Sequence, residues 1–190
     1  MPVTALDPKT ALVVIDLQRG ITGLPCAHPM EPVIANSVRL AEAFRSKGLP
    51  VVLVNVAFAA DFADALKPRV QMQQAARSLP PDFSLLIDDL RADPQRDVLI
   101  TKRNWGAFYG TGLDLQLRRR GITGVVLCGV ATSIGVESTA RDAYERNYNL
   151  TFASDAMTDM VLSAHQNSME VIFPRMGEIG TTDEILGFVR

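Results

Sequence analysis

Two charged side chains stand at the ends of apolar segments. Asp16 follows residues 11–15, ALVVI, and Lys102 closes a segment that begins at residue 97. Short apolar runs of this kind are typical of parallel strands that are covered on both faces. Because open α/β sheets bind ligands where their strands end, this carboxylate and this ammonium form a candidate site. Gln18 is expected to orient Asp16 and to contact substrate, although Asp16 could instead brace the loop that follows it.

A third apolar run, residues 125–128, leads into a turn of small residues that ends at Gly135. A helical pattern follows over residues 136–147. The N–H groups in the first turn of such a helix have no partners within the helix, so they point toward whatever lies in the crevice. This corner is suited to a carbonyl oxygen or an anion. The turn contains no Cys, and Gly135 stands where a nucleophile could have been presented.

Aromatic residues lie close to these strand ends in the sequence. Trp105 and Phe108 belong to the Gly-punctuated loop after Lys102, and Phe58 ends the apolar run that begins at residue 50. Aromatic side chains beside a charged strand end predict a pocket for a flat or apolar substrate group. Phe58 or Phe62 is a candidate wall of that pocket. Packing of these loops against the body of the protein is the alternative.

Residues 20–32 are rich in Gly and Pro and contain both Cys26 and His28. Their neighbours are turn formers, and no Asp, Asn or further His nearby completes a catalytic set. We therefore predict a flap over the pocket and keep a catalytic role for Cys26 as an alternative.

Apolar strands alternate with helical patterns about six times. The strands are predicted at residues 11–15, 50–58, 97–100, 121–130, 150–153 and 176–179, and the helices at residues 32–47, 113–120, 136–147, 158–172 and 184–189. This alternation predicts a doubly wound parallel sheet in one α/β domain that spans residues 1–190.

Composition narrows the class of protein. The 190 residues are 47% hydrophobic and carry a net charge of −2, which argues against nucleic acid or an anionic membrane as a partner. No apolar run approaches the ~18 residues of a membrane span, and the N-terminus does not look like a signal peptide. Two Cys residues give no disulfide framework, so we expect a cytoplasmic protein.

Three segments together resemble the isochorismatase-like hydrolases. They are ALVVIDLQ at residues 11–18, ITKRNWGAF at residues 100–108 and GVATSIGVESTARDA at residues 129–143. Their order and spacing match the family over nearly the whole chain. The resemblance implies a six-stranded parallel sheet with helices on both faces, in a Rossmann-like three-layer fold. It also implies an active site where the first, third and fourth strands end, and a homo-oligomer, either a dimer or a tetramer.

Most members of that family, the nicotinamidases and related amidases, carry an Asp, a Lys and a Cys. Asp16 and Lys102 match the first two, whereas Gly135 stands at the position of the Cys. Without a thiol no acyl-enzyme can form there. Isochorismatases also resemble this chain in having Gly at that position. Their chemistry needs no nucleophilic side chain, because a vinyl ether is protonated at carbon and water adds to the resulting cation.

The resemblance implies a mechanism without metal or cofactor, acting on a small molecule. Asp16 would be the general acid, and Lys102 would position Asp16 and the substrate. Backbone N–H groups around Ala131 and Gly135 would hold a substrate oxygen, with Thr132 beside them. Burial raises the pKa of a carboxyl group and a nearby ammonium lowers it, so two opposite effects act on Asp16. In the family, the peptide bond before the residue that matches Ala131 is often cis.

Two departures argue against isochorismate itself as the substrate. Residues 131–133 read Ala-Thr-Ser rather than the Tyr-Ala-His-like turn of isochorismatases, and residues 58–60 lack their Gln. Some nicotinamidases have a zinc site. This chain has only two histidines, His28 and His165, and so lacks the ligands for that site. We expect a hydrolase of an enol ether or a related bond. A catalytically silent ligand-binding member of the fold and an amidase with a relocated nucleophile are the alternatives.

Overall fold

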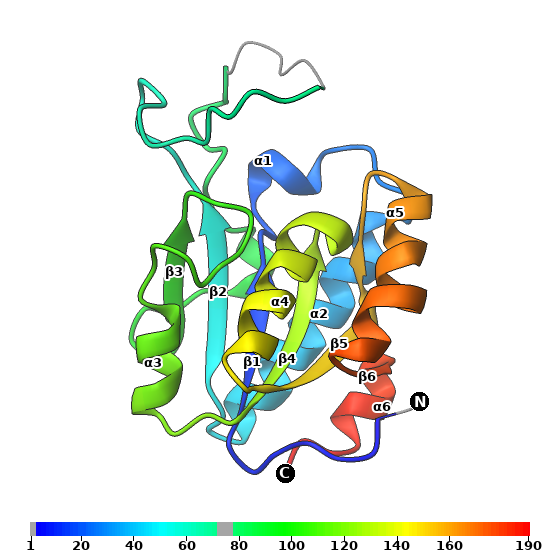
Figure 1. Ribbon diagram of the computed structural model, residues 1–190. Coiled ribbons are helices and arrows are strands. Elements are labelled where there is room, and N and C mark those ends of the chain that lie inside the picture. Colours follow the sequence, from blue (N-terminus) through cyan, green and yellow to red (C-terminus); the bar gives the residue numbers. More distant parts are fainter. Residues whose placement is uncertain (1–2, 72–77) are drawn as a thin grey trace.

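The computed structural model describes residues 3–71 and 78–190, and its centre is a parallel sheet of six strands (Figure 1). The strands are β1 (Thr10–Ile15), β2 (Val51–Val56), β3 (Val98–Lys102), β4 (Gly124–Val130), β5 (Asn149–Thr158) and β6 (Gly177–Gly180). They lie in the order β3-β2-β1-β4-β5-β6, and every neighbouring pair is parallel. The predicted six-stranded α/β sheet is confirmed.

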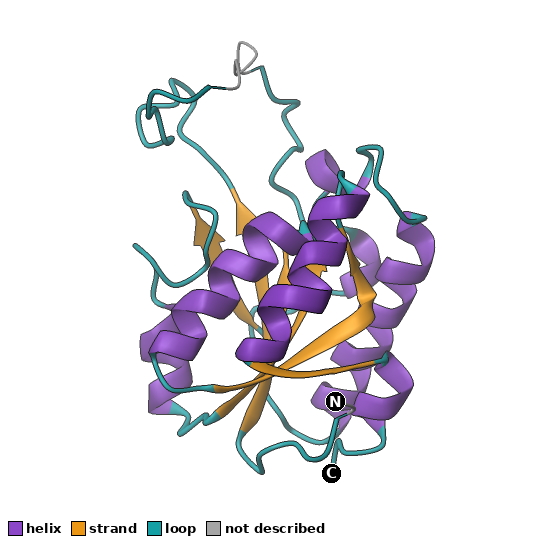
Figure 2. Cartoon of the chain, turned by 45° about the vertical axis from the view of Figure 1, so that its right-hand side comes forward, coloured by secondary structure: helices purple, strands orange, loops and turns teal. Residues whose placement is uncertain are grey.

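Helices cover both faces of this sheet (Figure 2). Helices α2 (Met30–Ser46) and α6 (Thr182–Leu186) pack on one face, and α3 (Leu113–Arg119) and α4 (Glu137–Glu145) pack on the other. The short helix α1 (Arg19–Thr22) follows β1, and α5 (Leu162–Asn167) follows β5. The remaining helical segments are Asp88–Leu90, Thr132–Val136, Ser168–Ile172 and Phe173–Arg175.

Strand β1 explains why the apolar runs are continuous. Val13 and Ile15 belong to the hydrophobic core under α3 and α4, whereas Leu12 and Val14 belong to the core under α2 and α6. Since successive side chains of a strand point to opposite faces, a strand between two helical layers has no polar face. At roughly 25 cal/mol per Å² of buried apolar surface, these two cores are the main stabilising contribution.

The order of the strands predicts where a ligand would bind. From β1 the chain runs outward through β2 and β3 on one side, and through β4, β5 and β6 on the other. Crossovers on opposite sides leave a crevice at the carboxyl ends of the two central strands. That crevice lies between the ends of β1 and β4, at the upper edge of the sheet in Figure 1.

The prediction for residues 150–172 needs correction. Strand β5 continues to Thr158, past its predicted end at residue 153, and helix α5 begins only at Leu162. The polar pair within the strand is tolerated because both side chains are bonded. Ser154 donates to the carbonyl of Gly180, and Asp155 accepts from Thr182.

The segment between β2 and β3 rises beyond the carboxyl edge of the sheet (Figure 1). Its predicted ambiguity over residues 59–78 falls partly on residues 72–77, which lie outside the described residues. The returning chain packs against the fold again, where Leu86 pairs with Gln18 and Leu90 is buried. None of the helices within the described ranges is long and apolar enough to cross a membrane.

Candidate active site

Asp16 follows β1 directly and has an unusual backbone conformation. Its φ is 52°, in the left-handed region that Asp tolerates better than most residues. The backbone N–H of Asp16 donates to the carbonyl of Val54 at 2.9 Å, which ties the end of β1 to β2. The residue is only 5% exposed. The fold therefore holds a carboxyl group in the crevice with little contact with water.

Lys102, the last residue of β3, reaches across the end of β2 to this carboxyl group. Its Nζ lies 2.7 Å from Oδ2 of Asp16, and it donates a second hydrogen bond to the backbone oxygen of Trp105 at 2.5 Å. Strands lie about 4.8 Å apart, so β3 is two strand spacings from β1 and only a long side chain spans the gap. Lys102 is 2% exposed, which makes this a buried ion pair.

Gly135 meets the same pair from the turn Thr132–Val136, which follows β4. A Cβ atom added at Gly135 would lie 3.2 Å from Nζ of Lys102 and 3.3 Å from Oδ2 of Asp16. It would also lie 2.9 Å from Cγ2 of Ile15, closer than real Cβ contacts allow. The structure thus brings the three predicted catalytic positions together, with bare backbone at the third.

Burial decides the acidity of Asp16. It raises the pKa of this carboxyl group to about 6, although the charge and the hydrogen bond of Lys102 both lower the pKa. Oδ1 of Asp16 is buried and has no hydrogen-bond partner among the described residues. Since buried polar atoms are rarely left unpartnered, this oxygen is a candidate to accept or share a hydrogen bond with a bound ligand.

A cavity of about 220 Å³ opens beside these groups. Its charged lining residues are Asp16 and Lys102, and its walls are largely apolar. The other lining residues are Ile21, Leu24, Val56, Phe58, Asn104, Trp105, Val130, Ala131, Ile134, Gly135 and Met160. The cavity therefore includes three of the predicted substrate-binding residues, namely Phe58, Trp105 and Ala131. The peptide bond between Val130 and Ala131 is cis, as the family resemblance implied.

The prediction that Gln18 contacts substrate needs correction. Gln18 is fully buried and does not line the cavity. Its amide nitrogen donates to the carbonyls of Val56 and Phe83, and its Oε1 accepts from the N–H of Val56 at 2.8 Å. Gln18 instead fastens the end of β1 to the end of β2 and to the returning segment.

Phe108 and Thr132 also lie outside the cavity lining. Phe108 belongs to the hydrophobic core, with its ring 6.0 Å from that of Tyr148. Thr132 is buried, and its Oγ1 lies 2.8 Å from Nδ1 of His165. Both side chains pack against the body of the protein. For Phe108, this is the alternative that the sequence left open for the aromatic loop.

Seven of the lining residues were not identified from the sequence, namely Ile21, Leu24, Val56, Asn104, Val130, Ile134 and Met160. Ile21 and Leu24 lie in the segment predicted as a flap, where apolar residues among Gly and Pro were the available signal. Met160 lines the cavity because β5 extends further than predicted.

Asp159 was missed as well. It accepts hydrogen bonds from both the backbone N–H and the Oγ of Ser133, at 2.7 and 2.8 Å. Asp159 thereby holds the turn that carries Gly135, and it directs Ser133 away from the cavity.

Cys26 and His28 do not line the cavity that Asp16 and Lys102 share. The pKa of the Cys26 thiol is raised by burial and by the charge of Asp159, which disfavours the nucleophilic thiolate. The ring of His28 contacts that of His165 at 4.7 Å between centroids. In the part of the chain that the structure describes, no group of three or more His, Cys, Asp or Glu side chains is arranged to hold a metal ion.

Comparison with known proteins identifies the family of this chain. The model of the isochorismatase domain matches residues 10–184. The chain is 48% identical to YecD of Escherichia coli O157:H7, described as an uncharacterized isochorismatase family protein, over 93% of this chain and 94% of that protein. A solved isochorismatase family protein from Burkholderia thailandensis is 44% identical and superimposes with a TM-score of 0.94, covering 98% of each chain.

A more distant match has a named activity. The N-carbamoylsarcosine amidase of Thermoplasma acidophilum is 31% identical, with a TM-score of 0.73, over 92% of this chain and 97% of that one.

Proposed function

The chain belongs to the isochorismatase family of hydrolases, and we propose that it cleaves an enol ether or a related bond of a small molecule without forming a covalent intermediate. The observation that carries this proposal is the meeting of Asp16 and Lys102 beside a glycine. A proton donor and a cation are present, and the position beside them carries no nucleophilic side chain.

Asp16 is the proposed general acid. Its pKa of about 6 lies close enough to neutrality for the protonated form to be populated, and a general acid works best when its pKa is near the working pH. The acid transfers its proton to the carbon of the enol ether that is distant from the oxygen. The neighbouring carbon becomes an oxocarbenium ion, with its positive charge shared by the ether oxygen.

Water completes the proposed reaction. It adds to the oxocarbenium ion and returns a proton to Asp16, and the resulting hemiacetal separates into an alcohol and a carbonyl compound. One water is consumed, and Asp16 ends the cycle protonated. Gly135 leaves room beside Asp16 and Lys102 where a side chain would otherwise stand.

Lys102 has the proposed role of positioning. An ammonium group has three N–H donors, and two of those of Lys102 serve Asp16 and Trp105. The third is suited to the oxygen of the substrate, together with the backbone N–H groups around Ala131 and Gly135. The ammonium also limits how far burial raises the pKa of Asp16.

Amide hydrolysis is the competing reaction, because the similar protein from Thermoplasma acidophilum is named as an amidase. The two reactions differ in whether a covalent intermediate forms on the protein, since an amidase with a nucleophile forms an acyl-enzyme. The purified protein should be given matched panels of simple enol ethers and simple amides, with mass spectrometry of the protein during turnover.

We expect hydrolysis of enol ethers and an unmodified protein mass throughout. Turnover of amides with a covalent adduct on any side chain would overturn the proposal, and so would the absence of turnover of every enol ether that binds in the cavity.

A further inference from the structure

We propose that the substrate of this cavity is a neutral molecule whose part beyond the reach of Lys102 is apolar. This inference rests on the proposed function, because it takes the cavity beside Asp16 and Lys102 as the place of reaction. It excludes doubly anionic substrates.

The first step concerns the charges that line the cavity. Among the described residues that line the cavity, Asp16 and Lys102 are the ones with ionisable side chains, and Nζ of Lys102 lies 2.7 Å from Oδ2 of Asp16. Lys102 also donates to the backbone oxygen of Trp105. A single ammonium that already has two oxygen partners can serve one further substrate oxygen. No second cation of the described lining is available for a second anionic group.

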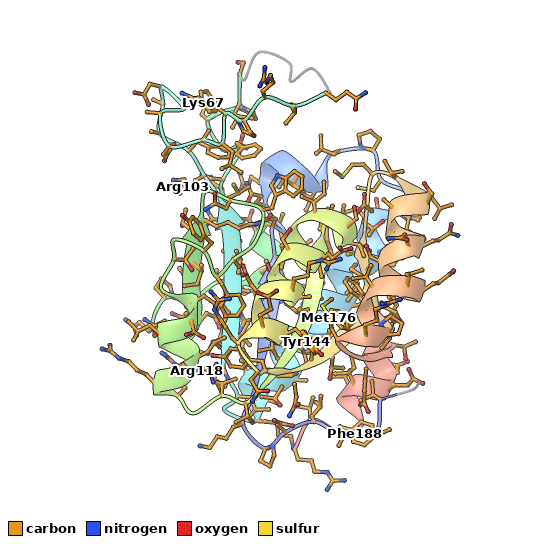
Figure 3. All side chains as sticks on the ribbon, viewed as in Figure 1. Lys67, Arg103, Arg118, Tyr144, Met176 and Phe188 are labelled. Atoms are coloured by element: carbon orange, nitrogen blue, oxygen red, sulfur yellow. The ribbon has the colours of Figure 1, made fainter. Side chains whose placement is uncertain are left out.

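Nearby cations are bonded elsewhere. Arg103, directly after Lys102, lies 2.5 Å through its Nε from Oδ2 of Asp64, on the segment between β2 and β3. Figure 3 shows Arg103 at the upper edge of the sheet, below the raised part of that segment. Arg19, next to Gln18, donates to both carboxylate oxygens of Asp88. Neither arginine lines the cavity.

The second step concerns the walls. Beyond the ion pair, the cavity is bounded by aliphatic, aromatic and thioether side chains, with Asn104 as the polar exception. The Nδ2 of Asn104 already donates to the carbonyl of Tyr109. A carboxylate placed against these side chains, away from the backbone N–H groups around Ala131 and Gly135, would lose water without gaining partners, which is strongly unfavourable. An apolar group there gains about 25 cal/mol for each Å² of surface that it buries.

The third step concerns size. The cavity of about 220 Å³ is smaller than the roughly 300–1,000 Å³ of typical ligand pockets. Its rim carries Leu24 and Trp105, which are 46% and 61% exposed. The fitting occupant is therefore one small ring or a short branched chain, attached to the oxygen that Lys102 holds.

The chain supplies its own probe for this inference. Trp105 is the single Trp of the sequence and lines the cavity, so its fluorescence reports binding without any need for turnover. The protein should be titrated with pairs of small, non-absorbing ligands that are matched in size and shape but differ in charge, such as cyclohexanecarboxamide and cyclohexanecarboxylate, in mildly alkaline buffer.

We expect the neutral member of each pair to bind at least about tenfold more tightly, which corresponds to about 1.4 kcal/mol. Equal binding, tighter binding of the carboxylate, or no binding of either member at millimolar concentration would overturn the inference.

Two variants of one wall position make the test specific. Leu24→Arg adds a cation at a half-exposed lining residue, and Leu24→Gln adds a polar group of similar length without charge. We expect Leu24→Arg to improve carboxylate binding by about tenfold, whereas Leu24→Gln should not. Improvement by both variants would indicate that the polarity of the wall rather than charge sets the preference, contrary to the inference.

These titrations are independent of the proposed reaction. If neutral ligands bind but no enol ether is cleaved, the proposed function fails and the ligand class stands. If anionic enol ethers are cleaved faster than their neutral counterparts, the ligand class fails and the reaction stands.

Discussion

The turn that follows β4 has two sides, and they treat polar groups differently. On the side toward β5 and α5, Thr132 is bonded to His165 and Ser133 is bonded to Asp159. On the opposite side, Gly135 faces a carboxyl group whose Oδ1 has no partner among the described residues.

Within this short turn, one side has a structural role and the other side faces the proposed site of reaction. Buried polar groups that are fully bonded hold a unique conformation, whereas a partly bonded group is costly unless something else completes it. The side toward β5 therefore positions the backbone around Gly135. The side toward Asp16 keeps a group that a substrate can complete. Substitutions on the two sides should accordingly differ in whether they reduce activity or stability.

The largest effect is expected from Asp16→Asn, which removes the proton donor and nearly preserves shape. We expect kcat/KM to fall by about 10²- to 10⁴-fold, the range that general acids contribute. Binding of a neutral ligand, followed by Trp105 fluorescence, is the control for an intact cavity. An Asp16→Asn protein with unchanged kcat/KM would show that Asp16 is not the proton donor.

Gly135→Ala tests the bare backbone on the same side. The added Cβ would lie within 3.3 Å of both charged groups and 2.9 Å from Ile15. We expect a loss of roughly 10²-fold in kcat/KM from displaced catalytic groups, and a loss of about 1–3 kcal/mol in the free energy of unfolding from overpacking.

The matched control for Gly135→Ala is Gly112→Ala, where a Cβ would meet nothing within 4 Å. It should cost less than about 1 kcal/mol and leave kcat/KM unchanged. Equal effects of the two substitutions would contradict a special role for residue 135.

Lys102→Met tests how the cation sets the acidity. A general acid works while protonated, so kcat/KM of the natural protein should decrease as the pH rises through about 6. Lys102 lowers the pKa of Asp16 by its charge and by its hydrogen bond. Its removal should therefore move this decrease to higher pH, besides lowering the maximal rate. A kcat/KM that instead increases with pH through this range would identify Asp16 as a base.

A smaller effect on activity is expected from Thr132→Val, on the supporting side of the turn. The substitution preserves shape but leaves the buried Nδ1 of His165 without its partner. The free energy of unfolding should decrease by about 1–3 kcal/mol, while kcat/KM should change by less than about tenfold. Thr123→Val is the control, since the Thr123 hydroxyl bonds to Asp7 at the exposed surface, and such changes usually stay within about 0.5 kcal/mol.

No effect on activity is expected from Cys26→Ala. Cys26 does not line the cavity, and its thiol has a raised pKa. Treatment of the natural protein with iodoacetamide should likewise leave kcat/KM unchanged, because Cys128, the other thiol, is fully buried. Inactivation that Cys26→Ala prevents would revive the amidase with a relocated nucleophile.

The sequence predicts those parts of the site whose positions are set by the ends of strands. Asp16 and Lys102 were found because each stands at or just beyond the carboxyl end of a strand, and Gly135 because it lies in the turn that follows β4. Parallel strands bring those ends to one edge. Competition between burial and Lys102 for the pKa of Asp16 could be stated from the sequence. Its outcome could not, because burial depends on packing from distant segments.

Side-chain direction in loops was beyond prediction. Phe108 and Trp105 lie three residues apart in one loop, yet Phe108 enters the core and Trp105 stands at the cavity rim. No periodicity fixes such choices outside regular elements. Gln18 was misassigned for a related reason, since its backbone partners, Val56 and Phe83, are distant in sequence.

Trp105 has a further consequence through its two ends. Its backbone oxygen holds the ammonium of Lys102, while its indole stands at the mouth of the cavity. A molecule that binds at the mouth of the cavity and the ammonium that sets the acidity of Asp16 therefore contact the same residue. Trp105 thus connects the mouth of the cavity to the cation beside Asp16.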